Sequence, residues 1–155
     1  ETLFNWLQAD VPGSRCLDLF AGSGALGFEA ASRGDAEEVM VEQNRDVASV
    51  LTQNITLLNA DNIQLVIADG LEWAMRNQYV FDIVFLDPPY TAGLLGQCCE
   101  ILQNGQSLAE NAKIYVEHAL GDDEIVIPES WECLKDKSAG QVAYKLFSRA
   151  SPHIA

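Results

Sequence analysis

The sequence has few basic side chains. Lysine and arginine together number 9 of 155 residues, against 23 aspartates and glutamates, which gives a formal net charge of −14. A protein that binds nucleic acid on its own normally carries a basic surface that neutralises phosphates. The composition therefore counts against a free-standing nucleic-acid-binding module, and any function that involves nucleic acid must answer this objection.

Long hydrophobic runs and metal-binding spacings are also missing. No apolar stretch approaches the roughly 20 residues of a membrane-spanning helix, and the first ten residues lack the basic start of a signal peptide. The four cysteines show no C-x-x-C spacing, and two of them are adjacent: Cys16, Cys98, Cys99 and Cys133. We therefore expect a cytoplasmic protein with reduced thiols, no metal site and no membrane association.

What the sequence does contain is an alternation of apolar runs and helical patterns. The expected strands cover residues 15–20, 37–42, 63–68, 81–86 and 112–118. The expected helices cover residues 24–33, 45–59, 70–77 and about 92–104. Two further strand-like halves flank the turn residues 138–140 within 131–150, as in a hairpin. The order predicts an α/β, Rossmann-like fold with a mostly parallel twisted sheet, helices on both faces, right-handed crossovers and a C-terminal antiparallel hairpin. This architecture is typical of class I methyltransferases, and we expect residues 1–155 to form one domain.

A glycine-rich loop lies between the first expected strand and the first expected helix of this pattern. Gly22, Gly24 and Gly27 form the spacing G-x-G-x-x-G, in the place where dinucleotide-binding loops carry it. Glu42 ends the second strand 20 positions after Gly22, which suits a carboxylate that accepts both ribose hydroxyls. These features alone fit a nicotinamide-dependent oxidoreductase as well as a methyltransferase.

Two acids at neighbouring strand ends help to separate these classes. Asp18 lies four residues before Gly22, where its charge would repel a pyrophosphate but attract the positive sulfur and ammonium of S-adenosylmethionine. The alternative role of Asp18 is to hold the loop through backbone hydrogen bonds. Asp69 ends the third strand beside Gly70, where it can accept a hydrogen bond from an adenine amino group, cap the following helix, or do both.

The motif Asp87-Pro88-Pro89-Tyr90 follows the most apolar strand. Two prolines end the sheet ladder in a stiff turn, at the edge where open α/β sheets bind ligands. An amine conjugated to a ring is a poor nucleophile because its lone pair is delocalised. The Asp87 carboxylate and the Pro88 carbonyl can accept from both N–H groups and direct the lone pair toward a methyl donor. Tyr90 is expected to stack on the planar acceptor, with a core position as the alternative. The motif predicts an amino methyltransferase.

Together these motifs resemble one family, the bacterial 16S ribosomal RNA guanine-N2 methyltransferases of the RsmD type. The resemblance rests on residues 17–30, 32–34, Glu42, Asp69-Gly70 and Asp87 to Tyr90, with 1–7 and 114–118 in support. It implies an enzyme that uses S-adenosyl-L-methionine, releases S-adenosyl-L-homocysteine, and methylates the exocyclic N2 of a guanine in 16S rRNA. We expect the RNA to be bound within a small-subunit ribosomal particle, with naked RNA as the alternative, and we expect a monomer, which suits an enzyme that docks on a large particle. Methyl transfer to DNA adenine or to a protein glutamine is the alternative within the same chemistry.

The resemblance also implies roles for individual residues. The implied cofactor-binding residues are Asp18, Phe20, Ala21, Gly22, Gly24, Glu42, Gln43, Asp69 and Gly70. The implied catalytic residues are Asp87, Pro88, Pro89 and Tyr90. Family members usually carry an extension rich in Arg and Lys before the segment that matches residue 1, and we expect this chain to lack it, which would answer the charge objection.

Several further residues receive weaker expectations. Glu117, at the end of the fifth strand, is expected at most to support the site from outside it. Phe4 and Trp6, on a first helix, can pack over the cofactor or in the core. The nearest approach to a basic cluster lies in the terminal hairpin and is interpreted as a solvated face: Lys135, Lys137, Lys145 and Arg149.

Overall fold

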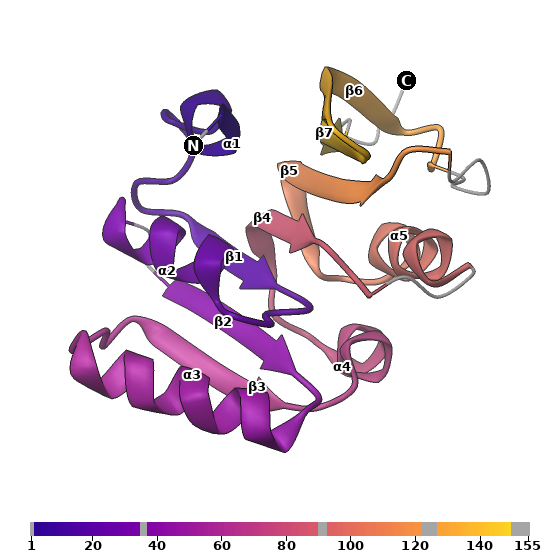
Figure 1. The fold of residues 1–155 in the computed structure, drawn as a ribbon. Coiled ribbons are helices and arrows are strands. Elements are labelled where there is room, and N and C mark those ends of the chain that lie inside the picture. The colour runs from indigo at the N-terminus through magenta and orange to yellow at the C-terminus, as the bar shows by residue number, and fades with distance from the viewer. Residues whose placement is uncertain (1, 35–36, 90–92, 122–126, 150–155) are drawn as a thin grey trace.

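The computed structural model describes residues 2–34, 37–89, 93–121 and 127–149 (Figure 1). Its strands are β1 (Arg15–Asp18), β2 (Glu37–Glu42), β3 (Ile63–Ile67), β4 (Phe81–Leu86), β5 (Leu108–Ala119), β6 (Trp131–Ala139) and β7 (Val142–Arg149). Its helices are α1 (Thr2–Trp6), α2 (Ala25–Ser32), α3 (Arg45–Leu57), α4 (Gly70–Arg76) and α5 (Leu94–Asn104). The strands and helices expected from the sequence are all present.

All seven strands form a single sheet in the order β3-β2-β1-β4-β5-β7-β6. Strands β1 to β5 pair in parallel, whereas β7 runs antiparallel to both β5 and β6. The order reverses at β1, which pairs with β2 on one side and with β4 on the other. Ligands of open α/β sheets bind at the carboxyl ends of the strands beside such a switch. The predicted fold class is confirmed, including the C-terminal hairpin.

The largest difference from the expected boundaries is at the start of β5. This strand begins at Leu108, four residues before the expected start. Its pairing with β4 shifts register between Phe81 and Ile83, and Asn111 has a φ of 62° in the same stretch. An irregularity of this kind breaks the two-residue alternation of side chains, which is the signal that locates a strand in a sequence.

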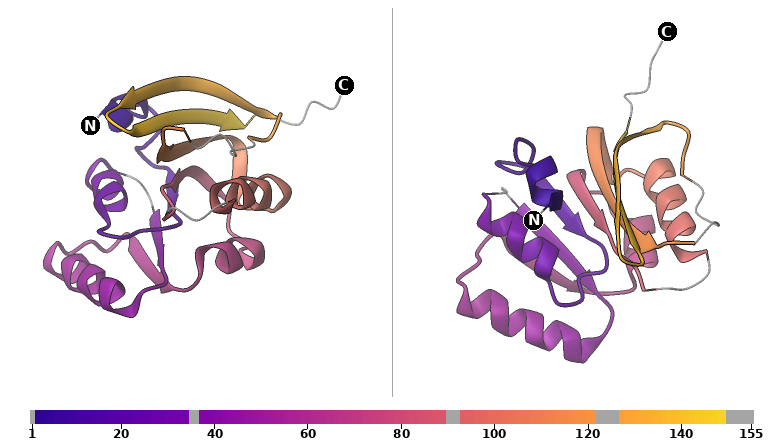
Figure 2. Two further views of the ribbon diagram at one scale, coloured as in Figure 1. Left: turned by 45° about the vertical axis from the view of Figure 1, so that its right-hand side comes forward. Right: turned by 45° about the horizontal axis from the view of Figure 1, so that its top comes forward.

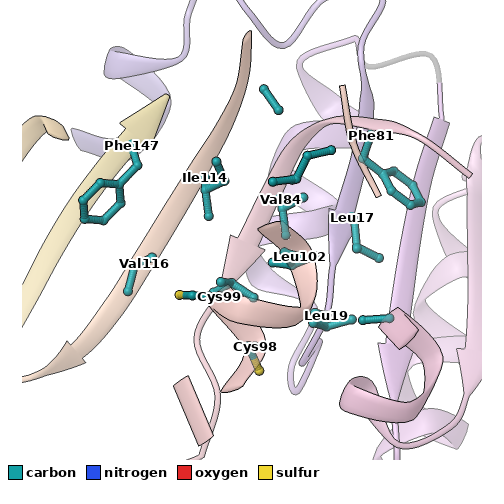
Figure 3. Close-up of a cluster of buried hydrophobic side chains, with 14 of the residues drawn as sticks. Leu17, Leu19, Phe81, Val84, Cys98, Cys99, Leu102, Ile114, Val116 and Phe147 are labelled. Carbon is teal, nitrogen blue, oxygen red and sulfur yellow. The ribbon is translucent and has the colours of Figure 1, made fainter. Parts of the chain in front are cut away.

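Helices cover both faces of the sheet (Figure 1), with α4 and α5 on one and α1, α2 and α3 on the other. Figure 3 shows apolar side chains of the strands meeting α5, which contributes Cys98, Cys99 and Leu102. Burial raises the pKa of the Cys99 thiol to about 12, so the thiol stays neutral. None of the four cysteines, all within the described ranges, forms a disulfide.

The opposite face buries aromatic side chains under α1. Phe4 of α1 packs on Phe85 of β4, with ring centroids 5.9 Å apart, and Phe85 meets Tyr115 of β5 edge-on at 6.5 Å. These contacts fix α1 over the middle of the sheet, close to the turn of the β6–β7 hairpin (Figure 2). Phe4 is therefore a core residue rather than a cover for the cofactor. In the part of the chain that the structure describes, no helix is long and apolar enough to cross a membrane.

Candidate active site

A cavity of about 520 Å³ opens at the carboxyl ends of β1 to β4. The predicted site residues that line it are Phe20, Gly22, Glu42, Gln43, Asp69, Gly70, Asp87, Pro88 and Pro89. A second cavity, of about 550 Å³, lies at the amino ends of the strands, around the starts of β2, β3 and β4. Because ligands of open α/β sheets bind at the carboxyl edge, the first cavity is the candidate active site.

Backbone conformation at the glycine loop explains why small residues stand there. Gly24 has a φ of 82° and forms the N-cap of α2. A Cβ atom at this position would lie 2.5 Å from the Phe28 ring and 2.6 Å from the Leu51 side chain. Only glycine combines this left-handed conformation with such close packing. The loop therefore brings the start of α2 tightly against α3.

Glu42 is held in place at the end of β2 by two backbone groups. The Gly22 N–H donates to its Oε1 at 2.8 Å, and the Asn44 N–H donates to its Oε2 at 2.9 Å. Each carboxylate oxygen has a second lone pair, so Glu42 can still accept from ligand hydroxyls. The glycine loop and the acid of the second strand thus form one rigid unit.

Asp69 caps α4 and also faces the cavity. Its Oδ1 accepts a hydrogen bond from the Glu72 N–H at 3.1 Å, so the predicted capping role is present. Gly70 follows at the first position of the helix, where a Cβ atom would lie 2.8 Å from the Leu19 carbonyl oxygen. The missing side chain allows α4 to begin directly against the end of β1.

Three of the predicted cofactor-binding residues do not line the cavity. Asp18 is only 2% exposed and lies beneath the loop, while Ala21 and Gly24 are buried behind it. Burial raises the pKa of Asp18 to about 7, the Asp87 charge adds to this rise, and backbone hydrogen bonds from Gly27 and Phe20 oppose it. These backbone hydrogen bonds are the ones that a loop-holding role requires, and the predicted cofactor role of Asp18 stays a prediction.

Asp87 stands at the end of β4, where the Pro88-Pro89 turn leaves the sheet. Its side chain is exposed at the rim of the cavity, and Pro89 is exposed beside it. Partial enclosure by the chain raises the pKa of Asp87, and a side-chain hydrogen bond with Glu117 lowers it in part. Tyr90 lies outside the described residues, so its predicted stacking role stays a prediction.

Glu117 lies closer to the site than the sequence analysis expected, because it is hydrogen-bonded to Asp87. Leu86 of β4 pairs with Val116 of β5, and the next residue along each strand is an acid, so Asp87 and Glu117 meet side by side. Burial, then the charge of Asp87, then their hydrogen bond raise the pKa of Glu117 to about 7. In its protonated form Glu117 donates to the Asp87 carboxylate. The sequence did carry a signal, because Glu117 directly follows the buried apolar residues Ile114, Tyr115 and Val116.

Comparison with known proteins identifies the family. Residues 1–148 match the family described as Conserved hypothetical protein 95. Over 149 residues the chain is 40% identical to Ribosomal RNA small subunit methyltransferase D of Escherichia coli strain K12, which covers 96% of this chain and 75% of that protein. The chain belongs to this family. The RsmD resemblance seen in the sequence is thereby confirmed.

Other RsmD relatives agree with this assignment. The protein of the same name from Haemophilus influenzae is 40% identical over 151 residues, 95% of this chain and 78% of that protein. A solved methyltransferase structure from Escherichia coli, 39% identical, superposes with a TM-score of 0.91 over 96% of this chain and 83% of that chain. A methylase structure from Haemophilus influenzae, 38% identical, gives 0.88 over 97% and 95%. The site is therefore that of a methyltransferase, and the nicotinamide-dependent alternative loses its support.

Proposed function

We propose that this protein transfers a methyl group from S-adenosyl-L-methionine to the exocyclic N2 of a guanine in 16S ribosomal RNA, within a small-subunit particle in the cytoplasm. The observation that carries the proposal is the Asp87-Pro88-Pro89 turn at the rim of a cavity that also holds Glu42 and Asp69. A hydrogen-bond acceptor for an amine thus stands next to acids suited to a nucleoside. The names of the relatives, which are ribosomal RNA small subunit methyltransferases, support the choice of acceptor.

The residues at the cavity fit S-adenosylmethionine. Glu42 offers carboxylate lone pairs for ribose hydroxyls, and Asp69 offers one for an adenine amino group. Glu42, Asp69 and Asp87 favour a ligand with positive rather than negative charge. When bound, this cofactor supplies an electrophilic methyl group on a positively charged sulfur. In the described part of the chain no cluster of His, Cys, Asp or Glu has the arrangement of a metal site.

The residues of the Asp87 turn would act mainly by orienting the amine. The Asp87 carboxylate and the Pro88 carbonyl accept from its two N–H groups, which turns the nitrogen lone pair toward the methyl donor. The stiffness of two consecutive prolines holds these hydrogen-bonding oxygens in place before the guanine binds. The resulting rate increase is one of positioning and electrostatic preorganisation.

The proposal is tested by transfer of labelled methyl groups from S-adenosylmethionine. The acceptors are small-subunit particles and stripped 16S rRNA from cells that lack the enzyme, together with a peptide release factor and plasmid DNA. We expect N2-methylguanine in the ribosomal RNA after digestion. Label in the release factor or in DNA adenine would support the amino-methyltransferase chemistry but would contradict the proposal that 16S rRNA is the methyl acceptor.

Substitution at Asp87 tests the mechanism in the same assay. We expect Asp87→Ala to lower kcat by at least about 100-fold, since it removes an acceptor that acts at the reacting nitrogen. Asp87→Asn keeps one acceptor oxygen and should retain part of the rate. The affinity for S-adenosylhomocysteine, measured by calorimetry, should change little in both variants. The control is Asp61→Ala, because Asp61 is an exposed acid at the amino ends of the strands, away from the candidate active site. Full turnover by Asp87→Ala would remove Asp87 from the mechanism.

A further inference from the structure

Strand register aligns three side chains in one row across the sheet, and a hydrogen bond adds a fourth. Glu117 of β5 pairs directly with Tyr144 of β7, and Tyr144 pairs directly with Lys137 of β6. Asp87 adjoins the row, since it is hydrogen-bonded to Glu117. Directly paired residues project from the same face of a sheet. The row therefore runs from acid to acid to aromatic to cation, starting at the rim of the cofactor cavity.

A separate cavity of about 350 Å³ lies over this row. Its walls come from α1, α2, β5 and the hairpin. Figure 2 shows that α1, at the start of the chain, lies beside the turn of the hairpin near the end of the chain. Trp6 and Tyr144, each half-buried, offer aromatic surface, and Tyr115 lies at its base. Glu117 and Lys137 are its charged lining residues. Because Glu117 also touches Asp87, the two cavities meet at this carboxyl pair.

The lining has the chemistry of a site for one nucleotide. Aromatic side chains stack on a base that has been turned out of its strand. The edge of guanine that carries N2 presents two kinds of donor, N1–H and the exocyclic N2–H groups, and two neighbouring carboxylates accept from both. An ammonium group such as that of Lys137, exposed at the cavity mouth, suits the phosphate. Adenine lacks an N1–H and would leave one carboxylate without a donor.

We propose that this cavity receives the acceptor guanine, and that Glu117 selects it by accepting a hydrogen bond from N1–H while Asp87 accepts one from N2–H. The assignment rests on the proposed function and adds to it the residue that distinguishes guanine from other amino-bearing bases. It makes Glu117 a residue that touches the substrate. It also moves Lys137 from a solvated face to the wall of the site.

The carboxyl pair also accounts for the protons. In the empty site one proton is shared between Glu117 and Asp87, and it leaves to water when the two N–H donors of the base arrive. The N2 lone pair then forms the new N–C bond, while the bond from methyl to sulfur breaks and its electrons stay on sulfur. The positively charged N2 loses one proton to the carboxyl pair, which restores the shared proton. One proton is released overall for each methyl group transferred.

The test uses particles reconstituted with 16S RNA in which the methylated guanine, located by the labelling experiment, is replaced by 2-aminopurine. This base keeps the N2 amine but has a bare N1 acceptor in place of N1–H. We expect the wild-type protein to prefer guanine by roughly 10- to 100-fold in kcat/KM. Glu117→Gln should lose most of this preference, because its amide can donate to the bare N1. The matched control is Glu110→Gln, the same change at an exposed position of the same strand.

Two further measurements separate this role from a structural one. The kcat/KM of the wild-type protein should rise with pH through about 7 as the pair ionises, and this rise should be absent in Glu117→Gln. Tyr144→Leu, which leaves both carboxyl groups in place, should raise KM for the RNA about tenfold. Unchanged affinity for S-adenosylhomocysteine would show that the variants are folded.

The outcomes show separately whether the assignment of Glu117 and the proposed function are correct. A wild-type protein that labels no guanine N2 overturns the proposed function and the assignment with it. A wild-type protein that labels guanine, combined with a Glu117→Gln variant that keeps the full rate and the full preference, overturns the assignment of Glu117 alone. A Tyr144→Leu variant with unchanged KM overturns the location of the base.

Discussion

At the scale of single residues, the buried acid Asp18 couples the glycine loop to pH. Its pKa rises from 3.8 to about 7 in the folded protein, chiefly because burial removes water from the carboxylate. A carboxyl group whose pKa is higher in the folded than in the unfolded state binds more protons when folded. The stability it contributes is therefore fully present below about pH 4 and is lost as the pH rises to about 7.

The Asp18→Asn variant tests this coupling. The free energy of unfolding of the wild-type protein should fall by up to about 4 kcal/mol more than that of the variant between pH 4 and pH 7.5. Urea unfolding at several pH values gives both curves, and their difference removes the carboxyl groups that the two proteins share. Asp61→Asn, at an exposed position, should run parallel to the wild type. A parallel curve for Asp18→Asn as well would contradict the assignment.

The positions of Glu42, Asp69 and Asp87 could be predicted from the sequence. Glu42 is the last residue of a strand, and Asp69 and Asp87 come just after one, so the chain order alone places all three at the carboxyl ends of the strands. Sequence reasoning gave Glu117 too little weight because its proposed role depends on a neighbour next to the adjacent strand. That neighbour, Asp87, is 30 positions away in the sequence, and only the strand register joins the two.

At the scale of elements, the start of α2 depends on a glycine in two ways. Gly24 has a positive φ, and its missing side chain leaves room for Phe28 and Leu51. Gly140, in the hairpin turn, also has a positive φ of 60°, but no atom lies within 4 Å of where its Cβ would be. The two positions share the backbone requirement and differ in packing.

Alanine at each position should separate the two requirements. We expect Gly140→Ala to cost about 1–2 kcal/mol in the free energy of unfolding, the usual cost of the left-handed conformation. Gly24→Ala should cost about 2–4 kcal/mol, because overpacking adds to that cost. Urea unfolding of both variants measures the difference. Equal losses would mean that the neighbours of Gly24 move aside freely.

The elements themselves were predictable because hydrophobic period and turn residues agree along most of the chain. The beginning of β5 is the exception, since a register irregularity interrupts its alternation. The contact between α1 and the hairpin was also out of reach. Trp6 and Tyr144 are separated by most of the chain, and no local pattern indicates that they line one cavity.

At the scale of the whole molecule, the charge is distributed in a way that the net value of −14 conceals. Acids gather at the carboxyl ends of β1 to β5, where a positively charged cofactor is proposed to bind. Strand β6 forms the far edge of the sheet, and its Lys135 and Lys137 are exposed there. Arg149 belongs to the fold instead, since its Nη1 donates to the Leu108 carbonyl at 3.0 Å. RNA that approaches over the hairpin would therefore meet Lys135 and Lys137.

This arrangement predicts how RNA binding by the chain responds to salt. A lysine that neutralises one phosphate of a single strand contributes about 0.7 to the slope of log K against log salt concentration. Lys137→Ala should lower the affinity and make the slope shallower by about this amount. Arg45→Ala, an exposed cation on α3 at the other end of the sheet, should leave affinity and slope unchanged. Binding to labelled RNA at several salt concentrations measures both. A slope that changes equally in the two variants would mean that RNA responds to the overall charge, and the approach over the hairpin would be wrong.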